Sequence, residues 1–256
     1  MKNITKIFFL IFTITLVLSS CANDVDDKGK VFVKIIESTE NNISETSVFK
    51  YNGNHIVSAE NSKQKIDYTY KEGFITKILI FDKENETTVV LEYKYSKGKL
   101  VQLTSSEDYK IYYTHNTDGT VSFEKFKRIS EGEDERVYHG VLYFKKKNLI
   151  KKEISFDIVD EDQVITSKIE FSYDTYNNPY NSILGYEKLL DKGAAVSKNN
   201  VMMTVAETTV VDGDQTISSA KMYTTSYKYD SDNYPIEQVS EASLNNPNYS
   251  KIQYLY

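Results

Sequence analysis

The 256-residue chain has one cysteine, three prolines, three histidines and no tryptophan. Because Cys21 is the only cysteine, no disulfide can form within the chain. His55, His115 and His139 lie far apart, and none has a second His or Cys at ligand spacing. A zinc site needs several convergent nitrogen or sulfur donors. We therefore expect neither a metal site nor a cofactor.

Motifs for nucleophilic or nucleotide chemistry are also missing. The sequence has no Gly-x-Ser-x-Gly elbow, no P-loop and no Gly-x-Gly-x-x-Gly segment. Carboxylates gather in short clusters, at 131–135, at Asp157 with 160–162, and at Asp212 with Asp214. A glycoside hydrolase needs two carboxyl groups facing each other across a cleft, whereas Asp beside Gly is typical of solvated turns. We favour turns and expect no enzyme; a glycosidase that uses these carboxylates is the alternative.

The chain carries more acid than base, with a formal net charge of −6. Lys2 and Lys6 are the only charged residues among 1–20, so removal of that segment would leave a net charge of −8. An acidic surface disfavours nucleic acid as a partner, because phosphate backbones are bound by clustered Lys and Arg.

The N-terminus has the features of a bacterial lipoprotein. Residues 7–18 form an apolar run that is too short to span a bilayer as a helix and that follows a lysine-containing start, which is typical of a signal peptide. Leu18-Ser-Ser-Cys21 then matches a lipobox, in which cleavage precedes Cys21 and its thiol is acylated. We expect a signal peptide over 1–20, a tether over 21–30, and an outer-membrane lipoprotein that faces the periplasm or the cell surface. The acidic tether is either an export signal or a solvated linker.

A strand–turn–strand unit recurs along the rest of the chain. In its clearest copy, residues 66–78, Ile66, Tyr68 and Tyr70 alternate with polar residues before Gly73. Side chains two apart share one face of a strand, and glycine permits the positive φ of a tight reversal. Repeats of 20 to 50 residues are typical of arrays whose units bury their faces against one another. Turn glycines of this kind stand at positions Gly53, Gly73, Gly98 and Gly119.

Residues 31–256 predict a single all-β domain, because no linker interrupts them and strand-forming residues dominate. We expect a long antiparallel up-and-down meander of roughly a dozen strands or more, forming a curled sheet or partial barrel. Near 181–190, apolar residues recur at helical spacing and predict one short helix that plugs or caps one end of the sheet; they are Ile183, Tyr186, Leu189 and Leu190. A long hairpin through Asp212-Gly213 is expected to follow.

Pairs of aromatic residues two apart are the candidate ligand platform. They comprise Tyr68 with Tyr70, Tyr93 with Tyr95, and Tyr227 with Tyr229. Each pair lies on one face of its expected strand, so that aligned pairs would form a ladder of rings. The rings either stack a sugar or another flat ligand, or serve as core residues with their hydroxyls at the rim. We favour the core, because the pair recurs in unit after unit as a structural requirement would.

Charged residues alternate with these aromatics. Asp67, Lys71, Glu92 and Lys94 fall on the opposite face of their strands. A lipid-spanning barrel needs apolar residues at such positions, so we do not expect an integral outer-membrane barrel. The basic run 145–152 is expected to be a solvated hairpin whose lysines discourage edge pairing.

Two segments carry a resemblance to known proteins. They are Tyr229-Asp-Ser-Asp-Asn-Tyr-Pro-Ile236, and Tyr173-Asp-Thr-Tyr-Asn-Asn-Pro-Tyr180 with the Ser197-Lys-Asn-Asn200 that follows the expected helix. The chain resembles a family of Bacteroidota lipoproteins of unknown function described as having a porin-like fold, and distantly the YD repeats of RHS-type shells. The later units lack the Gly-x-Leu/Ile element of YD repeats, which argues against an enclosed RHS-like shell. The resemblance covers nearly all of 31–256, implies a curled sheet or partial barrel, and supplies no catalytic residue.

These observations favour a non-catalytic envelope protein that is attached to the membrane through Cys21. Its sheet or concave interior would bind a glycan, a lipid or a protein. The first alternative to this binding module is a periplasmic half-barrel carrier of lipids or lipoproteins. The glycosidase is the second alternative. Such a carrier needs a continuous apolar concave surface.

Overall fold

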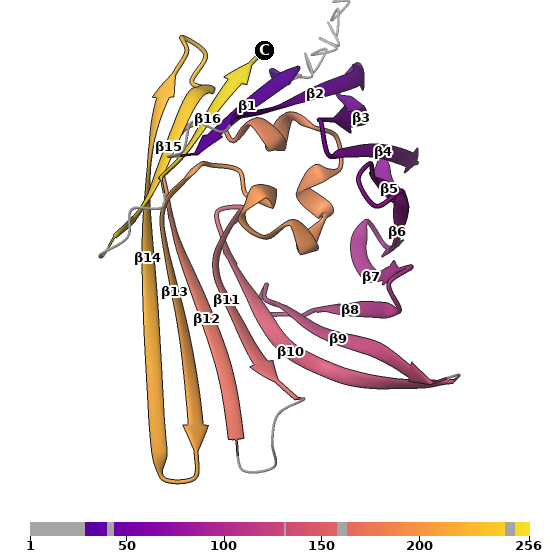
Figure 1. Cartoon of the computed structure of the whole chain (residues 1–256), viewed down its shortest axis with the longest axis vertical. Helices are drawn as coiled ribbons and strands as arrows, with labels where there is room; N and C mark the ends of the chain where they lie inside the picture. Colours follow the sequence, from indigo (N-terminus) through magenta and orange to yellow (C-terminus); the bar gives the residue numbers. More distant parts are fainter. Residues whose placement is uncertain (1–28, 40–43, 131, 158–162, 244–248) are drawn as a thin grey trace, which may run out of the picture.

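The computed structural model describes residues 29–39, 44–130, 132–157, 163–243 and 249–256. Over these ranges the chain forms a closed barrel of sixteen antiparallel strands, each paired with its neighbours in sequence (Figure 1). The expected all-β antiparallel meander is confirmed. The sheet closes completely, however, whereas a curled sheet or partial barrel was expected. Strand β1 pairs with β16, from Lys34 opposite Leu255 to Thr39 opposite Ser250. Closure satisfies the backbone groups that two open edges would leave unpaired.

The strands range from 6 to 15 residues in length. In chain order they are β1 (Lys34–Thr39), β2 (Ser44–Asn52), β3 (His55–Glu60), β4 (Gln64–Lys71), β5 (Phe74–Asp82), β6 (Thr87–Ser96), β7 (Lys99–Ser105), β8 (Tyr109–His115), β9 (Val121–Ser130), β10 (Glu133–Lys145), β11 (Asn148–Phe156), β12 (Gln163–Tyr173), β13 (Val201–Asp212), β14 (Gln215–Tyr229), β15 (Pro235–Ser243) and β16 (Tyr249–Leu255).

The recurring sequence unit corresponds to a hairpin with a bulge beside its turn. In the β4–β5 hairpin, Glu72 and Gly73 both have positive φ, 53° and 80°. Two successive residues of positive φ make the reversal that matches the twist of the flanking strands. The register shifts between Thr69 and Tyr70, so the second tyrosine of the unit lies at a β-bulge. The expected turn at Gly73 is therefore confirmed.

A segment inside the barrel connects β12 to β13. Three short 3₁₀ helices, η1 (Pro179–Ser182), η2 (Tyr186–Lys188) and η3 (Leu190–Val196), lie within the ring of strands (Figure 1). We call residues 178–200 the plug. The single helix expected near 181–190 is thus divided, because Gly185 takes a positive φ of 73° between η1 and η2. Gly185 also approaches the β4–β5 turn so closely that a Cβ there would lie 2.9 Å from the carbonyl oxygen of Gly73.

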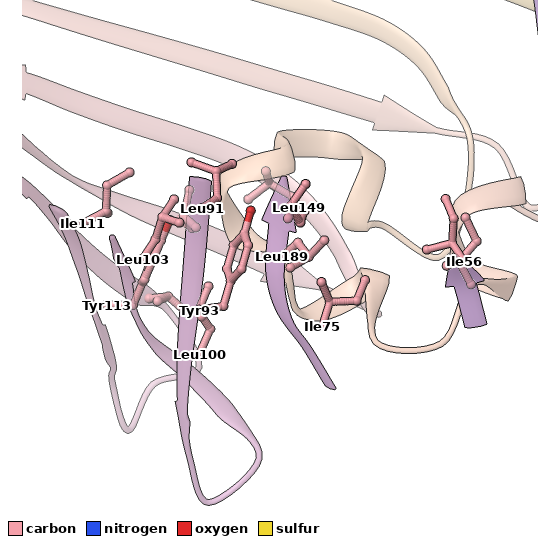
Figure 2. Close-up of a cluster of buried hydrophobic side chains, with 14 of the residues drawn as sticks. Ile56, Ile75, Leu91, Tyr93, Leu100, Leu103, Ile111, Tyr113, Leu149 and Leu189 are labelled. Carbon is pink, nitrogen blue, oxygen red and sulfur yellow. The ribbon is translucent and has the colours of Figure 1, made fainter. Parts of the chain in front are cut away.

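The plug fills a space that the strands cannot fill alone. A barrel of about sixteen strands is wide enough to enclose an aqueous channel. Here Ile183 and Leu189 of the plug are 1% and 0% exposed. Figure 2 shows Leu189 among strand residues of the same buried cluster, including Ile75, Tyr93 and Leu149. The expectation that this segment plugs one end of the sheet is confirmed.

The two ends of the barrel differ. Turns from even-numbered to odd-numbered strands, such as that at Gly73, lie at the end that holds the plug, because the strands run up and down in order. The described chain also enters there, since Gly29 lies against Ser182 of the plug and Tyr234. The β13–β14 hairpin, expected from the sequence, extends far beyond the plug at the opposite end (Figure 1).

The outer face of the barrel is charged. Ion pairs join neighbouring strands across it, at Lys77–Glu92 (3.3 Å), Lys168–Glu207 (3.1 Å) and Lys228–Glu237 (2.7 Å). The interior, by contrast, is built from Ile, Leu, Tyr and Phe. In the described part of the chain, none of the helices combines the length and apolarity needed to cross a bilayer.

Candidate functional site

The expected aromatic pairs of β4 and β6 point into the barrel and belong to its core or pack against it. Three of the four hydroxyls are hydrogen-bonded within the protein. Tyr70 donates to the carbonyl of Leu184 in the plug (3.2 Å), Tyr93 donates to Asp191 (3.1 Å), and Tyr95 donates to the carbonyl of Ile75 (2.9 Å). Burial raises the pKa of Tyr70 to about 12, so its phenol stays neutral at physiological pH.

The bond between Tyr95 and Ile75 is one of several of the same kind in the barrel. A ring near the end of an even-numbered strand bonds to the backbone near the start of the preceding odd-numbered strand. Other examples are Tyr173 to Leu149 (2.5 Å), Tyr227 to Val201 (2.9 Å), Tyr256 to Pro235 (3.0 Å) and, from an imidazole, His115 to Leu100 (2.9 Å). These side chains form hydrogen bonds with backbone carbonyl groups that lie near the turns at the plug end.

A cavity of about 350 Å³ lies between the plug and strands β13 to β16. We call it the lumenal cavity. All of its lining residues are uncharged. The plug contributes amides, small side chains and the ring of Tyr180, and the strands contribute aromatic rings, hydroxyls and one further amide. The main contributors are Asn199 and Asn200 from the plug, and Tyr223, Thr225, Tyr227, Gln238, Ser240 and Tyr254 from the strands.

Polar groups on the strand side of the lumenal cavity form a connected row. The hydroxyl of Tyr254 donates to Gln238 Oε1 (2.8 Å), and Gln238 Nε2 donates to Ser240 Oγ (3.3 Å). The hydroxyls of Ser240 and Thr225 are 3.0 Å apart. By contrast, the Tyr223 hydroxyl has no hydrogen-bond partner within the part of the chain that the structure describes. The row holds its members in place and leaves Tyr223 able to bond a ligand.

The remaining tyrosines of the expected platform, Tyr68, Tyr227 and Tyr229, lie in different parts of the barrel. Tyr227 lines the lumenal cavity and stacks on Tyr229, with ring centroids 5.7 Å apart. Tyr229 donates to Asp174. Tyr68 lines a second cavity of about 220 Å³ between the plug and strands β1 to β4. The structure therefore does not bring the six tyrosines together on one exposed ladder.

The turn carboxylates do not converge in the described ranges. Asp134 is paired with Lys110 (2.9 Å) and Arg128 (3.3 Å). Asp212 and Asp214 lie at the β13–β14 turn, far along the protruding hairpin. Residues 131 and 160–162 lie outside the described residues.

Asp157, expected in a turn cluster, lies instead in an ion-pair network. Arg136 donates two hydrogen bonds to its carboxylate, both 3.0 Å long, and a further bond of 2.8 Å to Glu124. His139 Nδ1 lies 3.0 Å from Asp157. Burial raises the pKa of Asp157, but the hydrogen bonds from His139 and Arg136 outweigh it and leave the pKa below its usual value.

Two lysines that point into the barrel were missed by the sequence interpretation. Lys152 was expected in a solvated hairpin, yet it lies on the inner face of β11, and Lys125 lies on the inner face of β9. The signal was present, because Lys125 is two residues from Phe123 and Lys152 is two residues from Ile154, which both face the core.

Cys21 and most of the expected tether lie outside the described residues. At the end of the tether, Lys30 pairs with Asp230 (2.7 Å) and Asp232 (3.2 Å) at the plug end of the barrel. Lipidation of Cys21 and cleavage after residue 20 remain predictions.

No protein-family model and no curated protein matches the chain. Among solved structures, it is similar to a porin-like protein from Bacteroides vulgatus ATCC 8482, at 14% identity and a TM-score of 0.56, over 89% of this chain and 99% of that chain. A porin-like protein from Bacteroides uniformis ATCC 8492 matches at 12% identity and a TM-score of 0.49, over 87% of this chain and 95% of that one. At such identities, the first likeness shows the fold, which is a porin-like β-barrel and agrees with the porin-like fold implied by the sequence resemblance.

Proposed function

We propose that the protein is a non-catalytic binding protein of the bacterial cell envelope, and that its lumenal cavity holds a small neutral ligand rich in hydroxyl groups, such as a mono- or disaccharide. The lumenal cavity is the observation that carries this proposal. Its volume of about 350 Å³ falls within the range of roughly 300–1,000 Å³ typical of small-molecule sites.

The chemistry of the lining favours this class of ligand. Tyr223, Tyr227 and Tyr254 offer ring surfaces, and Gln238 and Asn199 offer amides that both donate and accept hydrogen bonds. A sugar has apolar ring faces and hydroxyls that also donate and accept. Because no lining residue is charged, the lumenal cavity offers an ionic group no partner.

Binding is better supported than passage or lipid transport. The plug occupies the lumen, and its buried residues Ile183 and Leu189 pack into the core, which opposes an open channel. Ion pairs such as Lys77–Glu92 cover the outer face where a membrane-spanning barrel presents apolar residues to lipid. A lipid carrier needs a continuous apolar concavity, whereas the lumenal cavity is lined by polar groups as well as rings. The paired and separated turn carboxylates support a glycosidase poorly.

The proposed location is the outer membrane, with the chain attached through lipid on Cys21. Gly29 and Lys30 lie at the plug end of the barrel. An anchor eight residues before Gly29 would hold that end toward the membrane. The long hairpins at the other end would then point away from the bilayer.

Calorimetric titration of the purified full-length protein tests the binding proposal. The ligands are glucose, galactose, mannose, N-acetylglucosamine and the disaccharides cellobiose and lactose. Binding of at least one sugar is expected, and Tyr223→Ala should weaken it about tenfold, or about 1.4 kcal/mol. Tyr112→Ala is the matched control, because Tyr112 is a tyrosine exposed on β8 and lies outside the lumenal cavity.

The proposal requires that the two variants differ. Equal loss of affinity in both, or unchanged affinity in Tyr223→Ala, would place the sugar elsewhere. Absence of heat and of thermal stabilisation with every sugar would remove the neutral-sugar proposal.

A further inference from the structure

The inner wall formed by β8 to β11 carries two positive charges close to the plug. Lys125 of β9 is opposite Tyr138 of β10, and Lys152 of β11 is opposite Leu142. Tyr138 and Leu142 belong to the core or pack against it, so both lysines share the inward face. Both lysines lie inside the barrel, although the formal net charge of the chain is −6.

Neither ammonium has a carboxylate within ion-pair distance among the residues that the structure describes. Each lies over aromatic rings instead. Lys125 Nζ is 4.1 Å from the ring centroid of Tyr109 and 5.6 Å from that of Tyr138, and Lys152 Nζ is 5.3 Å from that of Phe123. On the outer face of the same strand, Lys151 has a carboxylate partner, Glu153, at 2.7 Å. Among the described residues, the two inner ammonium groups therefore have aromatic rings as neighbours and no carboxylate in direct contact.

Gly140 is the residue that lets the rings form a wall. It lies opposite Phe123 in the sheet, and a Cβ at this position would stand 2.6 Å from Phe123 Cζ. The ring of Phe123 thus crosses the space that a side chain would occupy, beside Tyr138. We call Tyr109, Phe123 and Tyr138, together with Lys125 and Lys152, the cationic wall.

The two ammonium groups of the cationic wall lack a negatively charged group in contact with them among the described residues. Burial lowers the pKa of Lys152; Asp191 of the plug opposes this, and the charge of Lys125 adds to it. A charge removed from water without a partner is unfavourable, and ring faces compensate only part of that loss. An anion placed between the two lysines would supply the missing partner with charge-assisted hydrogen bonds.

We propose that the cationic wall binds the anionic group of a small organic ligand, a carboxylate, sulfate or phosphate, while the ligand's ring lies against the half-buried rings of Tyr109 and Tyr138. This site is separate from the lumenal cavity, which is bounded by β13 to β16 and has no charged lining residue. It does not depend on the binding of a neutral sugar.

Matched ligands test the site in the full-length protein. Glucuronate, glucose 6-sulfate and glucose 6-phosphate each carry one type of anionic group, and glucose carries none. At low ionic strength, at least one anion should bind about tenfold more tightly than glucose. Lys125→Gln and Lys152→Gln should each weaken binding of the anion about tenfold, while the affinity for glucose stays the same.

Lys94→Gln is the control, because Lys94 lies on the outer face of β6 and its loss changes the net charge equally. Lys125→Gln and Lys152→Gln should both fold, because glutamine removes a partly buried charge and keeps a polar side chain at a position with no ion pair; thermal unfolding checks this. Equal affinity for the anions and for glucose overturns the proposal, and so does an equal effect of Lys94→Gln.

Discussion

Leu149 and Ser197 are joined by a closed circuit of hydrogen bonds. The N–H of Leu149 donates to Ser197 Oγ (3.0 Å), Ser197 donates to the Tyr173 hydroxyl (2.9 Å), and Tyr173 donates to the carbonyl of Leu149 (2.5 Å). Ser197 is 0% exposed and lies just after η3, whereas Leu149 is at the start of β11. The circuit ties the end of the plug to the wall of the barrel.

Ser197→Ala should destabilise the protein by about 1–3 kcal/mol, because the buried N–H of Leu149 loses its acceptor and the Tyr173 hydroxyl loses a donor. Denaturant unfolding of the full-length protein measures this change. Ser96→Ala, at the exposed end of β6, is the control and should leave the free energy of unfolding within about 0.5 kcal/mol of wild type. A loss no larger than that of the control would show that the circuit does not hold the plug.

Two tyrosine-to-phenylalanine changes should act in opposite directions. Tyr95 donates to the carbonyl of Ile75, so Tyr95→Phe should lower the free energy of unfolding by about 1 kcal/mol. The buried Tyr51 hydroxyl has no hydrogen-bond partner among the described residues, so Tyr51→Phe should leave stability unchanged or raise it by about 1 kcal/mol. The same unfolding experiment measures both, and destabilisation by Tyr51→Phe would reveal a partner for that hydroxyl.

Gly140→Ala should be strongly destabilising. A Cβ at this position would lie 2.0 Å from the carbonyl oxygen of Glu153, a backbone atom of the neighbouring strand that cannot move aside alone. Overpacking of this kind typically costs about 1–3 kcal/mol and occasionally more. The measurement is thermal unfolding, with Ser96→Ala at the exposed end of β6 as the control; a melting temperature equal to that of wild type would mean that β10 and β11 separate easily.

Asp157→Asn should destabilise the protein near pH 7, because it removes the charge that Arg136 and His139 contact. The pKa of Asp157 is lowered in the folded state, so its contribution is fully present above the unfolded-state value of about 3.9 and is lost as the pH falls through the folded-state value. The difference between variant and wild type should therefore shrink below about pH 4. Urea unfolding from pH 7 to pH 2.5 measures it; a difference that does not change with pH would exclude a role for the charge.

Cys21→Ser should release the protein from the membrane. Without the thiol no acyl chain can be attached, so the proposed anchor is lost. Metabolic labelling with palmitate and fractionation of membranes measure the effect. Ser20→Ala is the control, since it keeps the thiol. Label retained on the Cys21→Ser variant would disprove attachment at this residue.

The candidate sites could be predicted only in part. Alternation places Tyr227 on the same face as Tyr229, and it equally places Lys152 with Ile154, since both inferences need only the period of a strand. The cavity beside Tyr227 could not be foreseen, because Gln238 and Asn199 reach it from β15 and the plug, segments whose distance in space depends on closure of the sheet.

The sequence by itself determined the strands, their turns and the inward face, because alternation and a glycine such as Gly73 act over a few residues. Tertiary structure alone decided that β1 meets β16, that residues 178–200 enter the lumen, and that the inward Lys152 lies over Phe123 with no carboxylate in contact among the described residues. These outcomes depend on contacts between residues far apart in the chain. Local patterns do not encode such contacts, since the same alternation suits an open sheet and a closed barrel equally well.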